Sequence, residues 1–273
     1  MKKFVIIICF GLLIVACKNN QATNTSSVNS NNQAQIAFRQ DSIKREKIFA
    51  ALGDTVFGKI CYGMSKTQFQ KAINEFKKPL KDERTGDNFN FAGYSFDIYE
   101  PYQFEDKRNW SKSDISSLEY SLSDKSTSTL FYKGELVSVN WTAVGYSAYL
   151  MEQVTDKLNT LISYFEKRYG KPVVNNADKF DESNIEIGYT GRQKVMARWE
   201  TNNRKIVIYY QEIPYGERSR VNTNPYQYDL EVTFLDKQRK RVLNEHIQSI
   251  IQKIQDEERA KERQKQKNME NAL

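Results

Sequence analysis

The amino-acid sequence predicts an α+β fold in which helices pack on an antiparallel sheet. Apolar residues recur at helical spacing in three separate segments, 65–78, 151–165 and 243–254, and this spacing indicates amphipathic helices. Between them, short segments alternate apolar and polar residues and are separated by turn residues, as in antiparallel strands. A helix followed by several such strands occurs twice. We therefore expect two α+β halves, 36–146 and 147–236, although no residue-level repeat relates them.

The first expected element is a helix from Ile36 to Leu52. Gly53 supplies a C-terminal stop for this helix. The next segment, Thr55 to Tyr62, is apolar and β-branched enough to form a short strand. The apolar residues near one face of the helix are Ile36, Ile43, Ile48, Phe49 and Leu52.

A second helix is expected after Ser65. Ser65 is a favourable N-cap, and Gln68 three residues later completes a capping box. Pro79 ends the helix because proline cannot continue it. The residues expected on its buried face are Phe69, Ala72, Ile73 and Phe76.

The start of this second helix, Gly63 to Phe69 (Gly-Met-Ser-Lys-Thr-Gln-Phe), is similar to a stretch of a known family. It resembles the start of the helical pair in the small lipoprotein subunit of the outer-membrane β-barrel assembly machine. The resemblance implies a fold only, and no functional residue is carried over. Lys77-Lys78-Pro79 departs from the glycine-containing helix end of that family.

Strands are expected through the rest of the first half. Residues 89–98 alternate apolar and polar residues on either side of a bulge or tight turn. Segments 126–132 and 136–144 predict a hairpin with its turn at 133–135. Residues 101–117 are polar and charged, so we expect a loop there.

The second half is expected to begin with a helix. Ser147 is a suitable N-cap for it, and Gly170 and Pro172 end it. Trp141 and Trp199 fall in the middle of expected strands, so we expect both in the core. The strands expected after this helix are 185–190, 194–201, 204–211 and 227–235.

A C-terminal helix and charged tail are expected over 237–273. Leu243, Ile247, Ile250 and Ile254 lie on one helical face. Docking of this face on the protein's own sheet is favoured over docking in a partner's groove. After Gln255 the apolar face ends, and the remainder is either a solvated helix or a frayed tail.

The N-terminal residues have the three-part layout of a secretory signal. Lys2 and Lys3 form a basic start, and the apolar run from Phe4 to Val15 is too short to span a bilayer. The end of the run, Ile14-Val15-Ala16-Cys17, resembles the lipobox of bacterial lipoproteins. The resemblance implies cleavage of residues 1–16 and lipidation of Cys17. The alternative is an ordinary signal peptide with a chance cysteine.

Residues 17–35 are expected to be the lipidated cysteine and a flexible linker, because they contain almost no large apolar residue. The residues after Cys17 are Lys18-Asn19-Asn20, without an adjacent aspartate. In lipoproteins this fits delivery to the outer membrane, and we expect the protein to face the periplasm. The acidic cluster of some surface-export signals is absent.

Composition argues against several classes of function. The formal net charge is +7, but basic and acidic residues are interleaved along the chain, so we expect no nucleic-acid partner. His246 is the only histidine, so we expect no metal site and no catalytic histidine. Cys9 would leave with the signal and Cys17 would be lipidated, so Cys61 could not form an intramolecular disulfide. An inert buried thiol is favoured at Cys61 over a nucleophile. No phosphate loop or dinucleotide fingerprint implies a cofactor.

One stretch is rich in the side chains that dominate protein interfaces, tyrosine and arginine. We treat it as a candidate interaction surface, although a long hairpin connection with half-buried tyrosines is the favoured interpretation. The candidate residues are Tyr209, Tyr215, Arg218, Arg220, Tyr226 and Tyr228.

These observations predict a non-catalytic, membrane-anchored binding or scaffolding module with an envelope protein as partner. The alternative is a hydrolase that uses two carboxylates and acts on envelope or dietary glycans. The sequence singles out no carboxylate pair for such a site. The pool is Asp97, Glu100, Glu105, Asp106, Glu119, Asp181, Glu182, Glu186, Glu200, Glu212 and Asp229.

Overall fold

The structure is a computed structural model, and it confirms the α+β fold class. Its described residues are 25–77, 89–91, 93–98, 101–105, 109–122, 129–147, 150–177, 194–214 and 226–271. The chain divides into two units, residues 1–40 and 41–273. The signal peptide and Cys17 lie outside the described residues, so those predictions remain predictions.

Helix α1 (Thr25–Ala51) begins earlier than the sequence suggested. The helical backbone includes residues 25–35, which we expected to be a flexible linker. These residues contain neither proline nor glycine, so nothing in them stops a helix that continues from Ile36. The expected apolar face is only partly buried, because Ile36 and Ile43 are both more than half exposed.

The end of α1 is attached to the sheet through a buried arginine. The Arg45 side chain donates hydrogen bonds from Nε to the Glu200 carbonyl at 3.1 Å and from Nη1 to the Lys171 carbonyl at 2.9 Å. Burial is the largest influence on this guanidinium, and it lowers the pKa of Arg45 from its ordinary value. Gly53 follows the helix with φ +53°, which confirms the expected stop.

A short hairpin and a capped helix follow α1. Strands β1 (Thr55–Phe57) and β2 (Ile60–Cys61) pair antiparallel. Helix α2 (Lys66–Lys77) has the expected capping box: the Ser65 backbone N–H donates to Gln68 Oε1 at 2.8 Å, and the Gln68 N–H donates to Ser65 Oγ at 3.3 Å. Pro79 lies outside the described residues.

Within the described residues, nine strands form one sheet in the order β3-β4-β7-β11-β10-β9-β8, with β6 also paired to β7 and β5 paired to β6 in parallel. Their bounds are β3 (Phe89–Phe91), β4 (Tyr94–Ile98), β5 (Pro101–Phe104), β6 (Thr129–Tyr132), β7 (Glu135–Ser147), β8 (Val174–Asn175), β9 (Lys194–Glu200), β10 (Arg204–Pro214) and β11 (Tyr226–Asp236). The expected strand 185–190 lies outside the described residues.

The two expected halves share this sheet and do not form separate bodies. The last strand of each, β7 and β11, pair antiparallel at the centre of the sheet, from Ser138↔Leu235 to Ser147↔Tyr226. The expected boundary at residue 147 therefore falls within a strand. Ser147 ends β7 and does not cap a helix, and helix α4 (Leu150–Tyr169) begins at Leu150.

The main core joins the sheet to helices α2 and α4 and to Phe49 at the end of α1. Trp199 is fully buried and donates a hydrogen bond from its indole Nε1 to the Gly170 carbonyl at 2.6 Å. The Phe165 ring on α4 lies edge-on to Trp199, with ring centroids 5.6 Å apart, and packs against Phe234 at 5.8 Å. Both central tryptophans, Trp141 and Trp199, belong to this core as expected.

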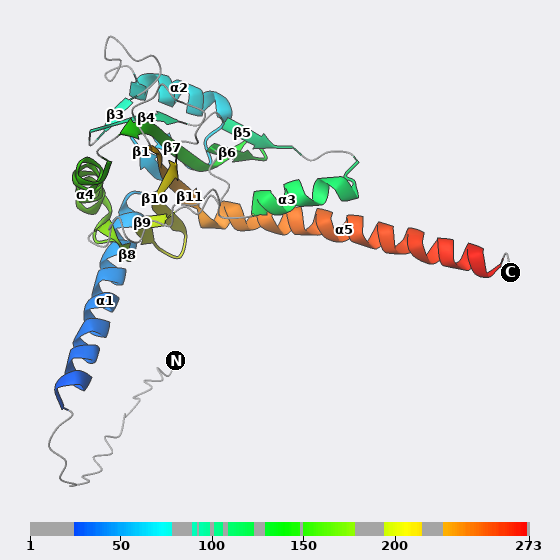
Figure 1. Cartoon of the computed structure of the whole chain (residues 1–273), viewed down its shortest axis with the longest axis horizontal. Coiled ribbons are helices and arrows are strands. Elements are labelled where there is room, and N and C mark those ends of the chain that lie inside the picture. Colours follow the sequence, from blue (N-terminus) through cyan, green and yellow to red (C-terminus); the bar gives the residue numbers. More distant parts are fainter. Residues whose placement is uncertain are drawn as a thin grey trace, which may run out of the picture. The chain divides into compact units, whose positions relative to one another are not determined.

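A second apolar cluster holds the C-terminal helix α5 (Lys237–Glu270). Figure 1 shows helix α3 (Ile115–Leu122) lying along the first part of α5. The sequence predicts a loop over residues 101–117. The structure instead has strand β5 and a short 3₁₀ turn, η2 (Lys112–Asp114), in this segment. The predicted apolar stripe of α5 is buried in this cluster, and Ile251 is buried with it. The stripe consists of Leu243, Ile247, Ile250 and Ile254. The expected docking on the same chain is confirmed.

The remainder of α5 is a solvated helix and not a frayed tail. Helical backbone continues to Glu270, and no residue of α5 after Ile254 is buried. In the part of the chain that the structure describes, no helix is long and apolar enough to cross a membrane.

Candidate functional site

The predicted tyrosine and arginine surface falls mostly outside the described residues. Tyr209 lies on β10 and is partly buried. The backbones of Tyr226 and Tyr228 belong to β11, where they pair with β7 and β10. The structure does not describe the side chains of these two tyrosines. It also does not describe Tyr215, Arg218 and Arg220. This surface therefore remains a prediction.

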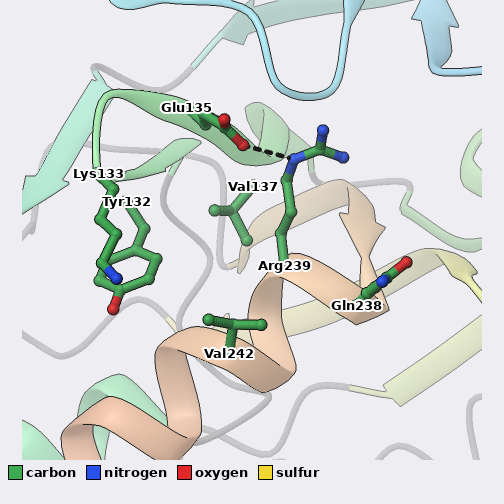
Figure 2. A pocket seen from close by; sticks show the side chains of 7 residues that line it. All are labelled: Tyr132, Lys133, Glu135, Val137, Gln238, Arg239 and Val242. Carbon is green, nitrogen blue, oxygen red and sulfur yellow. Dashed lines mark hydrogen bonds and ion pairs between the residues drawn. The ribbon is translucent and has the colours of Figure 1, made fainter.

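A pocket that the sequence did not indicate lies between the β6–β7 hairpin and the first turns of α5. We call it the hairpin pocket. Its volume is about 350 Å³. Figure 2 shows two valines between Lys133 on one side and Arg239 with Gln238 on the other. The lining residues are Tyr132, Lys133, Glu135, Val137, Gln238, Arg239 and Val242.

The hairpin turn fixes one wall of this pocket. Tyr132 and Glu135 are partners across the hairpin, so the turn consists of Lys133 and Gly134. Both have positive φ, 50° and 79°, as a type I′ turn requires. The Lys133 ammonium lies 5.3 Å from the centroid of the Tyr132 ring. The buried Tyr132 ring therefore provides a surface along which the Lys133 side chain lies.

The start of α5 forms the opposite wall. Asp236 caps the helix by accepting hydrogen bonds from the N–H groups of Gln238 and Arg239, both at 2.9 Å. The Arg239 guanidinium binds Asp236 as well, and its Nε donates to Glu135 Oε2 at 3.0 Å. Partial burial alone would lower the pKa of Arg239, but the hydrogen bonds to Asp236 and Glu135 raise it above its ordinary value. Arg239 is thus a fixed cation with two carboxylate partners.

Gly63 gives Arg239 the space that it needs. Gly63 has φ +77°, and a Cβ at this position would lie 2.5 Å from Arg239 Nη2. Backbone hydrogen bonds from Gly63 N to the Leu136 carbonyl at 2.9 Å and from Leu136 N to the Met64 carbonyl at 3.0 Å hold this segment against β7. Any larger side chain at Gly63 would therefore displace the guanidinium.

The pocket offers a cation beside an apolar floor. Val137 is fully buried, whereas Val242 is 43% exposed and presents apolar surface to solvent. Glu135 is bound by Arg239, and no carboxylate among the described residues forms an ion pair with Lys133. This arrangement suits binding of a small apolar group that carries one negative charge.

The carboxylates considered for a hydrolase site, where the structure describes them, either form ion pairs within the fold or are exposed to solvent. Glu200 forms ion pairs with Lys237 at 3.0 Å and Arg198 at 3.3 Å. Asp97, Glu105 and Glu119 are exposed. The side chains of the other members of the pool lie outside the description.

His246 is closer to the core than its charged sequence surroundings suggested. Its Nδ1 lies 2.9 Å from the Tyr132 hydroxyl, and its ring packs edge-on against Phe104. Cys61, which we expected to be buried, is half-buried on β2, where it is a free thiol. Among the described residues, no group of three histidine, cysteine, aspartate or glutamate side chains could hold a metal ion.

Comparison with known proteins adds no family assignment. The two resemblances of the sequence, at Ile14–Cys17 and at Gly63–Phe69, therefore rest on those residues alone. No protein-family model matches the chain, and no curated protein or solved structure matches it significantly.

Proposed function

We propose that the protein is a lipid-anchored lipoprotein of the bacterial outer membrane, facing the periplasm, and that it acts as a non-catalytic binding or scaffolding module. The observation that carries this proposal is the lipobox-like sequence Ile14-Val15-Ala16-Cys17 after a basic start and a short apolar run. An envelope protein is the proposed partner.

Lipidation would supply the membrane attachment. Each buried CH₂ group of an acyl chain contributes about 0.8 kcal/mol, and more than one chain is needed for stable anchoring. A lipoprotein cysteine carries several chains, so the anchor at Cys17 would hold the protein permanently.

Two surfaces support a binding role. The hairpin pocket combines apolar surface at Val242 with the cation of Lys133, a combination typical of sites for small ligands or side chains. The tyrosine and arginine stretch from Tyr209 to Tyr228 has the composition of a protein interface.

The state of the mature N-terminus tests this proposal. We expect native protein from the membrane fraction to begin at an acylated Cys17 by mass spectrometry, and Cys17→Ser to remain unprocessed. Cys9→Ser is the matched control because Cys9 lies inside the signal, and it should be processed normally. A mature protein that begins at another residue, or that is soluble, would refute the lipid anchor.

The binding role needs its own test. Photo-crosslinking in intact envelopes should join the protein to an envelope protein, and the crosslink should disappear when the folded body is deleted and only the anchor is kept. A wild-type protein that gives no crosslinked partner from either surface would count against the binding role.

A further inference from the structure

The residue at the rim of the hairpin pocket has an unusual backbone conformation. Lys133 is the only described residue other than glycine with positive φ, at 50°. Side chains other than glycine, asparagine and aspartate cost about 1–2 kcal/mol in this left-handed conformation. Asparagine or glycine would make the same turn at lower cost. The stability of the turn therefore does not favour a lysine at this position.

The Lys133 ammonium has donors available for a ligand. A lysine ammonium has three N–H donors, and the contact observed here is with the face of the Tyr132 ring. Glu135, two residues along the hairpin, is bound by Arg239, and Arg239 is itself balanced by Glu135 and Asp236. Among the described residues that line the pocket, Lys133 is thus the one charged side chain without a counterion.

Apolar surface lies beside this cation. Figure 2 shows Val137 and Val242 between Lys133 and Arg239. A volume of about 350 Å³ is near the lower end of the range for ligand pockets, roughly 300–1,000 Å³. A long acyl chain would need a deeper apolar channel than two valines and one tyrosine provide. The pocket therefore fits one or two amino-acid residues.

We propose that the hairpin pocket binds the C-terminal residue of a protein partner, with its carboxylate on the Lys133 ammonium and an aliphatic side chain against the exposed surface of Val242. A carboxylate hydrogen-bonded to an ammonium is a charge-assisted contact, roughly twice as strong as a neutral one. This inference rests on the proposed binding function and names the chemistry of the partner.

The test measures binding of short peptides to the full-length protein in detergent micelles by isothermal titration calorimetry. The probe is acetyl-Gly-Ala-Leu with a free C-terminal carboxylate, compared with the same peptide as its C-terminal amide and with octanoate. We expect the amide to bind at least about tenfold more weakly. Octanoate should bind more weakly than the free-acid peptide because it lacks the peptide backbone and branched side chain.

Lys133→Asn is the decisive variant because asparagine fits the turn while the ammonium is removed. We expect it to bind the free-acid peptide about tenfold more weakly, with a melting temperature equal to or above that of the wild type. Lys265→Asn is the matched control, since it removes the same charge from the exposed end of α5, and its affinity should be unchanged.

Three results would overturn the inference: no binding of the free-acid peptide, equal binding of acid and amide, or unchanged affinity in Lys133→Asn. Tighter binding of octanoate than of peptide would assign the pocket to fatty acids and would also reject a protein C-terminus. If the peptide fails while the membrane-bound protein still crosslinks to an envelope protein, this inference falls and the proposed function stands. Loss of the crosslink as well would reject both.

Discussion

Replacement of Ile247 by alanine tests the docking of α5. Ile247 is fully buried, in the cluster that α5 forms with α3 and β6. Truncation of a buried isoleucine to alanine removes apolar contacts and leaves a cavity, at a cost of about 2–5 kcal/mol. For a chain of this size, each kcal/mol lowers the melting temperature by roughly 2–4 °C. We therefore expect Ile247→Ala to melt roughly 4–20 °C below the wild type.

Thermal unfolding followed by circular dichroism measures this difference. Gln248→Ala is the matched control, because Gln248 is the next residue of the same helix and is exposed. Alanine favours helix at least as well as glutamine, so this variant should melt within about 2 °C of the wild type, as surface substitutions usually do. If Ile247→Ala also melts within that margin, α5 is not packed as described and the reasoning fails.

Two further predictions concern the end of α5 and alkaline pH. Truncation after Gln255 should leave the melting temperature unchanged, because no residue of α5 after Ile254 is buried; a loss of several degrees would show that the exposed end is packed. Burial raises the pKa of Tyr62 well above its ordinary value and raises that of Tyr169. The unfolded chain therefore loses these protons first, near pH 10, so stability is complete below that pH. Above that pH, the stability should fall by at most about 1.4 kcal/mol per pH unit for each tyrosine, until the folded state also loses the proton. Tyr62→Phe should make the decline of melting temperature between pH 9 and 11 shallower, and an equal slope in both proteins would contradict this account.

The helices were predictable because their signals are local. The capping box at Ser65 and Gln68, the α5 stripe and the positive φ of Gly170 after α4 depend on residues a few positions apart. Helix α3 was missed within a polar segment, although Ile115, Leu118 and Leu122 have helical spacing. Strand β5 was missed because it pairs with β6 in parallel, and that partner is a property of the fold and not of the segment.

The hairpin pocket could not have been predicted from any local pattern. The turn at Lys133 and Gly134 was predictable, but its wall at Arg239 comes from a helix 104 residues further along than Glu135. A pocket of this kind depends on the docking of α5, which the sequence indicates only as an apolar stripe. The clue that sequence alone could offer was a lysine at a turn position where asparagine is preferred.

The central pairing of β7 with β11 also determines when the chain can fold. Strand β11 supplies the partners for residues 138–147 of β7, yet it lies some 80 residues downstream. Contacts between such distant segments form slowly, because a long loop must close first. During synthesis from the N-terminus, one edge of β7 has no partner until residues 226–236 have been made. An open edge of that length can pair with another unfinished chain. The β7 edge therefore stays open to such pairing until the last strand of the sheet has been made.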